Sequence, residues 1–471
     1  MYQKPDRDQL SLDEFVLPFG GRLSSGNRWV KIAGQIPWEM IEDHYAESFR
    51  NEKPDGRKPV PARVAFGAIY IKEHENLTDE RTVENIAENP YMQYFLGLKG
   101  FRAAPLFDPS LMVWFRKRFP AEFIAKINEE IYRRNGPPKD PGGEGGGNDG
   151  ILVLDATVAP ADIRYPTDIS LLNECRENTE KIIDEIWDKT NRQGHKTAYS
   201  RKNARKQFLN IIKKRRHKPG EIRDAIQEQL IYVQKNIETL EGLITEFRIR
   251  LKNKHIARLI TIQEVIKQQE EMLKGNKHTV ENRIVSLRQP HVRPVVRGKA
   301  GRPVEFGQKL EFSVVNGFTF IDVQDWNNFN EGVTLIESAE KYKKRHGVYP
   351  EAVLADKIFR NRENFRFCKL NGIRLSGSGP GKFKTNNEGY DEQTYRDNCD
   401  RNIVESRNGI VKRRYGLGLI MTRLMCTSET EAALNVLVMN IAHVMRVLLR
   451  KFPAHYFQQI FRFNVSVTWP W

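Results

Sequence analysis

Two aspartates far apart in the chain have the surroundings expected of a site that binds divalent cations. Asp155 follows the apolar run at 151–154, and Asp356 follows a second apolar run at 352–355. Runs of this length predict buried strands, and the carboxyl ends of strands in α/β sheets commonly open into ligand sites. We therefore expect the two carboxylates to meet at one edge of a sheet.

A third acidic residue, Glu405, lies in a segment that reads as a helix beginning near Cys399. Arg401 precedes Glu405 by four residues and Lys412 follows it by seven, so one helix face would carry a carboxylate between two cations. Three carboxylates suit two Mg²⁺ ions, which promote phosphoryl transfer, while Arg401 and Lys412 would contact phosphates. An isolated aspartate after a strand is more often a cap or turn residue, so the argument depends on the combination.

The elements that must position these residues follow from hydrophobic periodicity and turn chemistry. Residues 309–315 and 318–323 predict antiparallel strands joined by a tight turn at Asn316-Gly317. The next predicted elements are a helix at 332–346, the strand at 352–355, a helix at 362–370 and a short strand at 373–375. The last third of the chain is predicted to be helical. With the strand before Asp155, this order is typical of an α/β, ribonuclease H-like core built on a mixed sheet.

Shifts in composition divide the chain into five segments. We predict an N-terminal all-helical, DNA-binding domain over 1–135, a Gly/Pro linker over 136–150, a catalytic core over 151–165 and 305–450, a basic helical insertion over 166–304, and a C-terminal tail over 451–471. Apolar residues from Ile222 to Leu251 recur at steps of three, four or seven, and a second stripe follows. This pattern predicts a coiled-coil-like helical hairpin inserted in the core, its stripe forming an intramolecular core or, alternatively, a dimer interface.

The charge balance points to a polyanionic partner such as nucleic acid. Lys and Arg number 76 against 60 Asp and Glu, which gives a net charge of +16. Residues 189–218 contain no acid, and we expect DNA to bind there, with a solvated surface helix as the alternative. A second acid-free stretch, 283–302, predicts an extended basic arm or a surface linker. The cations assigned to DNA are Arg201, Lys202, Arg205, Lys206, Lys213, Lys214, Arg215, Arg216, Arg401, Lys412, Arg413 and Arg414.

The cysteines and the N-terminal segment bear on the compartment. The four cysteines form no CxxC pair and have no histidine at zinc-ligand spacing, so we expect reduced thiols in the cytosol. The segment MYQKPDRDQL lacks the apolar core of a signal peptide, and no run of about 18 apolar residues occurs. These features predict a cytoplasmic protein without a membrane partner.

Three segments resemble the catalytic blocks of bacterial insertion-sequence DDE transposases of the insertion sequence five superfamily. They are LDATVAPADIRYPTDISLLNECRE, LADKIFRNRENFRFCKLNGIRLSG and RNIVESRNGIVKRRYGLGLIMTRL, and PVPARVAFGAIYIKEHENLTDERTVENIAENPYMQYFLGL is similar to the N-terminal domain of that family. The resemblance implies that Asp155, Asp356 and Glu405 bind two Mg²⁺ ions, with Mn²⁺ as a substitute. It also aligns Arg401 and Lys412 with a Tyr-x2-Arg-x3-Glu-x6-Lys signature, in which Asn398 replaces the tyrosine.

The resemblance implies an activity and its partners. The expected reaction is metal-dependent cleavage of DNA at terminal inverted repeats, followed by strand transfer into target DNA by a homodimer assembled on DNA in the bacterial nucleoid. Two alternatives stay open. One is a ribonuclease H-like nuclease without strand transfer, and the other is a non-catalytic DNA-binding protein derived from a transposase.

Overall fold

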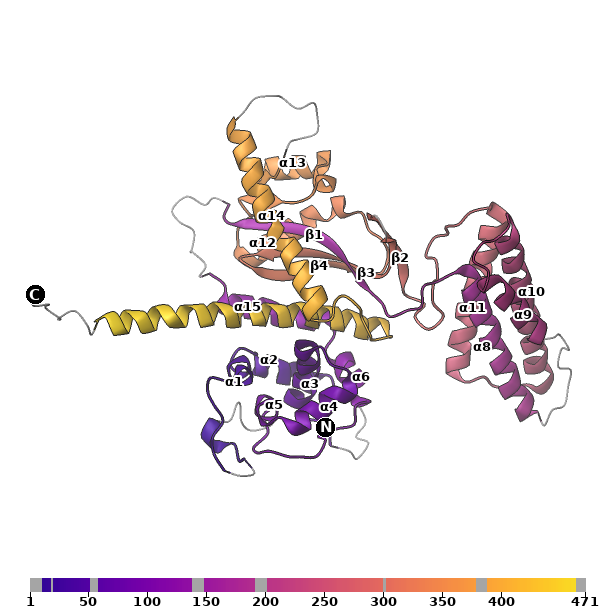
Figure 1. Ribbon diagram of the computed structural model, residues 1–471, viewed down its shortest axis with the longest axis horizontal. Helices are drawn as coiled ribbons and strands as arrows, with labels where there is room; N and C mark the ends of the chain where they lie inside the picture. Colours follow the sequence, from indigo (N-terminus) through magenta and orange to yellow (C-terminus); the bar gives the residue numbers. More distant parts are fainter. Residues whose placement is uncertain are drawn as a thin grey trace, which may run out of the picture. The chain divides into compact units, whose positions relative to one another are not determined.

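The computed structural model describes residues 11–17, 20–50, 58–137, 148–190, 201–299, 302–377 and 388–462 (Figure 1). Most of the predicted Gly/Pro linker, part of the first acid-free stretch and the last nine residues lie outside these ranges. The chain divides into two compact units. The first comprises residues 1–160, 309–325 and 329–471, and the second comprises residues 161–308 and 326–328.

Short helices form the N-terminal part of the first unit, as the pattern of caps and prolines predicts. Thr78 accepts a hydrogen bond from the Arg81 backbone N–H, and Asn89 caps the helix whose first residue is Pro90. Their core is aromatic, with the rings of Trp38 and Phe95 5.3 Å apart. The elements are η1 (Leu12–Glu14), α1 (Arg28–Ala33), α2 (Trp38–Glu47), α3 (Ala62–Glu75), α4 (Asp79–Glu88), α5 (Pro90–Phe95), α6 (Leu111–Arg118) and α7 (Ala121–Asn135).

A mixed sheet lies mainly in the first unit, and its residues 293–299 and 302–308 belong to the second unit. Its strands are β1 (Ile151–Pro160), β2 (Arg293–Lys299), β3 (Arg302–Val315), β4 (Phe318–Asp325), β5 (Ala352–Leu354) and β6 (Arg374–Leu375). The strand order is β2-β3-β1-β5-β6, and β4 also pairs with β3. The β1–β5 and β5–β6 pairs are parallel, whereas β3 pairs with β2 and β4 in antiparallel fashion.

The predicted hairpin is confirmed, but one of its strands is longer than expected. Asn316 and Gly317 have φ values of 50° and 80°, the positive pair that a type I′ turn requires. However, β3 begins at Arg302, and its first part pairs with β2 from Arg293 to Lys299. The prediction of an extended basic arm over 283–302 was therefore wrong for this part, because Val295 is buried and the backbone is paired in a ladder.

Helices follow the sheet strands along the chain. These elements are η2 (Glu331–Val333), α12 (Leu335–His346), η3 (Lys357–Phe359), α13 (Arg362–Leu370), α14 (Glu388–Arg414) and α15 (Met425–Arg462). The predicted start of a helix near Cys399 was wrong, because α14 begins at Glu388. The first turns of α14 are mostly polar and carry no apolar period, but Arg374 at β6 holds Asp397 by two contacts of 2.6 and 3.0 Å. This tertiary ion pair fixes a stretch that the sequence pattern does not mark.

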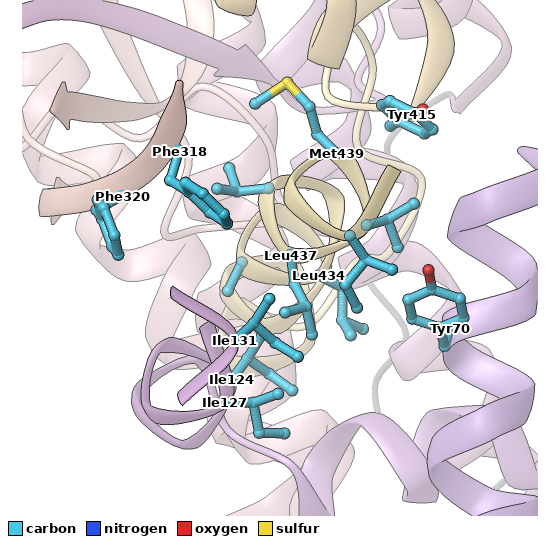
Figure 2. Packing of buried hydrophobic residues seen from close by; sticks show 14 of the residues in the cluster. Tyr70, Ile124, Ile127, Ile131, Phe318, Phe320, Tyr415, Leu434, Leu437 and Met439 are labelled. Carbon is cyan, nitrogen blue, oxygen red and sulfur yellow. The ribbon is translucent and has the colours of Figure 1, made fainter. Parts of the chain in front are cut away.

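Helix α15 joins the N-terminal helices to the sheet. Leu434, Leu437 and Met439 pack among side chains of α7 and β4 (Figure 2). At Thr319 of β4, the backbone N–H donates to Asn440 of α15, and the carbonyl accepts from Asn440 at 2.7 Å. Residues 425–448 are apolar enough to cross a membrane, but 67% of that window is buried within the protein. We conclude that this part of α15 is a core helix.

The second unit contains four helices rather than only the predicted hairpin. They are α8 (Asp168–Lys189), α9 (Arg201–Ile212), α10 (Glu221–Phe247) and α11 (Asn253–Gly275). The α10–α11 hairpin is confirmed. Leu230 and Val233 of the apolar stripe pack with Leu172 of α8 and Ile262 of α11, all buried. The stripe therefore forms an intramolecular core, as the preferred reading predicts.

A buried network of charges connects α3 and α6 to α15. Lys72 Nζ lies 2.7 Å from Glu73 Oε1 and 3.1 Å from Glu431 Oε1, and Arg116 pairs with Asp79. Burial raises the pKa of Glu73 to about 7 although Lys72 opposes the shift. Burial acts likewise on Glu431, but Lys72, the Thr422 hydrogen bond and Arg116 together outweigh it and lower that pKa. With Glu73 protonated, the two cations balance the two remaining carboxylates.

We predict that Glu73→Gln removes a pH-dependent loss of stability. The folded-state pKa of Glu73 lies above its unfolded value, so the unfolded chain releases this proton first and wild-type stability falls as the pH rises from about 4.5 to 7. Because the amide of glutamine does not titrate, the variant should not show this loss of unfolding free energy, which is on the order of 2–3 kcal/mol in the wild type. Thermal unfolding at pH 5 and pH 8 tests this, with the exposed Glu84→Gln as control. Equal pH dependence in wild type and Glu73→Gln would contradict the prediction.

Candidate active site

The register of the parallel strands places the two aspartates at the same height. Val153 pairs with Leu354, so continuing the register by two residues puts Asp155 opposite Asp356. Contrary to the prediction, β1 does not end at Asp155 but runs on to Pro160, because its next residues are buried apolar side chains beside β3. Asp155 therefore lies where β1 has passed the carboxyl end of β5, at the edge where Asp356 begins the next loop.

Each aspartate also has a local structural role. Asp356 caps η3, because its Oδ1 accepts a hydrogen bond of 2.7 Å from the Lys357 backbone N–H. Its side chain is nevertheless 63% exposed. Asp155 is half-buried, and its Oδ2 accepts a hydrogen bond of 2.7 Å from Asn408 Nδ2 of α14. The carboxylates are thus held in place, and that of Asp356 is open to solvent.

One face of α14 connects all three carboxylates. Arg401 Nη1 lies 3.2 Å from Asp356 Oδ1, and Arg401 Nη2 lies 3.9 Å from Glu405 Oε1. The spacing of Arg401, Glu405, Asn408 and Lys412 by four, three and four residues places them on one side of the helix. The adjacent face includes Val404 and Val411, which are buried where α14 packs on β1 and β5. Arg401 of this helix therefore contacts Asp356 and Glu405, and Asn408 contacts Asp155.

The donor set fits a hard divalent cation by its chemistry. Asp155, Asp356 and Glu405 offer only carboxylate oxygens, the ligands that Mg²⁺ and Mn²⁺ prefer. Within the described residues, no three acidic, histidine or cysteine side chains are close enough together to hold a metal ion. The guanidinium of Arg401 instead supplies the positive charge between Asp356 and Glu405. A cation bound by these residues would take over that charge compensation.

Two residues near the site were not singled out from the sequence. Asn408 contacts Asp155, and its own Oδ1 is buried without a hydrogen-bond partner among the described residues. Glu311 of β3 is fully buried, and burial, with the negative charges of Glu331, Asp322 and Asp155, raises its pKa to about 9. Glu311 is therefore neutral at pH 7. The sequence alone gives no sign of this burial, because apolar and polar residues alternate along this strand and Glu311 falls on the polar side, which the pattern predicts to face solvent.

The cations assigned to DNA fall into two groups. Arg413 and Arg414 are exposed in the last turn of α14 in the first unit, and Lys412 is half-buried. Arg401, also on α14 in the first unit, is half-buried. The remaining eight belong to the second unit, on α9 and the following loop, and all are exposed except for the half-buried Arg201. Arg201 pairs with Asp184 of α8 at 2.7 Å, and Lys214 pairs with Glu221 of α10. The stretch 189–218 contains no acidic residue, but acids of the neighbouring helices α8 and α10 form ion pairs with two of its cations.

Comparison with known proteins identifies two domains in this chain. Residues 18–118 match the family described as a transposase domain (DUF772), and residues 353–442 match the family described as a transposase DDE domain. The second match contains Asp356 and Glu405. A curated relative, the uncharacterized protein ORF8 in the nfe locus of Rhizobium meliloti, is 32% identical over 145 residues, which cover 30% of this chain and 66% of the relative. No solved structure matches.

We predict that Arg401→Gln changes the function of this site without unfolding the protein. Asp356 and Glu405 are 63% and 62% exposed, so water screens the ion pairs and the variant should lose less than about 1 kcal/mol of unfolding free energy. Denaturant unfolding of both proteins measures this loss. A loss of several kcal/mol would show that Arg401 supports the fold, and functional effects of the variant would then not be local.

Proposed function

Because the chain belongs to the DDE transposases, we propose that it cleaves DNA at transposon ends and transfers the freed strand to target DNA. In this proposal Asp155, Asp356 and Glu405 bind two Mg²⁺ ions, for which Mn²⁺ can substitute. The observation that carries it is the register of β1 and β5, which sets Asp155 opposite Asp356, together with the arginine that Asp356 shares with Glu405.

The sheet supports the proposal of a ribonuclease H-like core. The order β4-β3-β1-β5-β6 has antiparallel partners on the β3–β4 side and parallel partners on the β5–β6 side of the central strand β1. We interpret β1 and β5 as the two strands that carry the aspartates and α14 as the helix that carries the glutamate. The catalytic core then consists of the sheet with α12, α13 and α14, and the second unit is an insertion after β1.

The proposed reaction has two phosphoryl-transfer steps. Water attacks a phosphodiester at the transposon end, a P–O bond breaks, and the released strand carries a 3′-OH. That hydroxyl then attacks a target phosphodiester, forming a new P–O bond as the target 3′ oxygen leaves and takes up the proton, through solvent, to become a hydroxyl. Two bound divalent cations supply activation of the nucleophile and stabilisation of the leaving oxygen.

The side chains around the carboxylates orient the site and the substrate. Asn408 holds one oxygen of Asp155 by its amide N–H. Arg401 is half-buried on the same helix face and, once released from Asp356, can donate to a phosphate oxygen. Lys412 lies farther along that helix face and adds positive charge that attracts the same DNA strand. Asn398 cannot supply the hydroxyl that the family signature places there.

DNA is the proposed partner beyond the scissile phosphate. On helix α9, Lys202, Arg205 and Lys206 are exposed, whereas Ala204 and Phe208 are buried. The three cations therefore lie on the outer side of the helix. A stripe of cations on the exposed face of a helix suits a phosphate backbone. We further propose that the N-terminal helices bind the terminal inverted repeat and that two copies assemble on DNA.

We predict that Asp155→Asn, Asp356→Asn and Glu405→Gln each abolish Mg²⁺-dependent cleavage, because each removes a charged ligand while keeping the side-chain size. The loss should exceed about a hundredfold, whereas DNA affinity should change little. Asp400→Asn is the matched control, since Asp400 is an exposed acid of the same helix that points about 140° away from Glu405. The assay follows strand cleavage and joining on DNA from the ends that flank the gene. Cleavage that survives these substitutions would refute the site, and cleavage without joining would favour a nuclease.

We predict that replacing Lys202, Arg205 and Lys206 by glutamine weakens DNA binding more at low salt than at high salt. Each lost phosphate contact should reduce the slope of log affinity against log salt by about 0.9. Fluorescence anisotropy with a labelled duplex measures the slope. The control replaces Lys235, Lys267 and Lys277, which are exposed cations of the same unit on or next to α10 and α11. Equal slopes for the two triple variants would contradict a specific role for α9.

A further inference from the structure

An exposed group of apolar side chains lies in the loop that joins α14 to α15. Leu419, Met421, Leu424 and Met425 are 47%, 55%, 45% and 49% exposed. We call these four residues the apolar loop. Exposed large apolar side chains that are close together in a soluble protein commonly mark an interaction site. The proposed catalytic steps use none of the four.

The backbone of this loop is firmly held. Gly418 N donates to the Lys412 carbonyl at 3.2 Å, and Ile420 N donates to the Pro160 carbonyl at the end of β1 at 2.7 Å. Farther on, Thr422 N donates to Glu431 Oε2 at 3.2 Å. The side chain of Ile420 is fully buried. The apolar loop is therefore exposed because the fold holds it outward, and a partner would bind it at little cost in conformational entropy.

The charges around the apolar loop identify the class of partner. No acidic residue occurs from residue 408 to residue 428, and Arg413, Arg414 and Arg423 are all exposed. Two copies of such a surface would repel each other, whereas a polyanion would neutralise it. The loop also follows the helix that carries Glu405, and it contacts Pro160 of β1, five residues or about 17 Å beyond Asp155. These features favour an anionic partner that offers apolar surface and extends a few base pairs from the proposed active site.

We propose that the apolar loop is a wedge that enters the DNA duplex a few base pairs from the scissile phosphate, with Met421 and Leu424 between base pairs. Exposed base faces offer the apolar surface, and the flanking arginines contact the phosphates on either side. Apolar side chains can unstack and bend a duplex in this way, because burial of the side chain offsets the cost of unstacking. This inference rests on the proposed function and adds how the DNA is deformed at the site.

The test uses the full chain and short duplexes from the DNA that flanks the gene, each carrying 2-aminopurine at one position within about five base pairs of the expected cleavage position. Wild-type protein should raise the fluorescence of the base as it unstacks. The double variant Met421→Ala/Leu424→Ala should lose this rise and bind about tenfold more weakly, with an unchanged salt slope because no phosphate contact is lost. Arg423→Gln should instead lower the slope by about one. Leu370→Ala, at a 76% exposed leucine of α13, is the matched control.

Several outcomes would overturn the wedge. Equal fluorescence and affinity in wild type and the double variant would show that the apolar loop does not enter DNA. A double variant that binds DNA normally but loses self-association in sedimentation would make the loop an interface between copies. Thermal unfolding of each variant excludes a folding defect. Failure of the wild-type protein to bind DNA in a salt-dependent manner would refute the proposed function itself, which the first two outcomes leave intact.

Discussion

The position of α14 across β1 and β5 is the constraint on which the site depends. Buried Val404 and Val411 fix the helix on the sheet, and this turns Arg401 and Asn408 toward the loops after the strands. Carboxylates that converge on one point repel each other, so a site of this kind needs a compensating charge in its resting state. Arg401 supplies that charge between two of the acids. In the proposed function, the same guanidinium would be available to a phosphate once a bound metal compensated the carboxylates.

Helix α15 extends this constraint to the N-terminal helices. Its side chains pack on α7 and β4 (Figure 2), and Asn440 completes the hydrogen bonds of the strand at Thr319. Glu431, near the start of the same helix, pairs with Lys72 of α3 and also holds the backbone of the loop before α15. One helix thus contacts the N-terminal helices, the edge of the sheet and the apolar loop.

Positive charge has different consequences in different parts of the chain. In the second unit, acids on α8 and α10 pair with Arg201 and Lys214, so the acid-free stretch is neither wholly unpaired nor evenly exposed. In the first unit, the acid-free stretch after Glu405 combines exposed arginines with exposed apolar side chains, which a simple electrostatic contact with phosphates does not need. In the proposed DNA complex, cations of both units therefore make a salt-dependent contribution to affinity, and the apolar loop after α14 makes an apolar contribution.

Local signals determined much of this protein. The apolar runs before Asp155 and Asp356 are strands, the Asn316-Gly317 turn makes the hairpin, and the stripe of α10 is a helix, because periodicity and turn chemistry act over a few residues. Tertiary packing decided the rest. The early start of α14, the contact of Asn408 with Asp155 and the burial of Glu311 arise from residues far apart in the chain. Such contacts depend on strand register and on which faces pack together, and no short stretch of sequence contains that information.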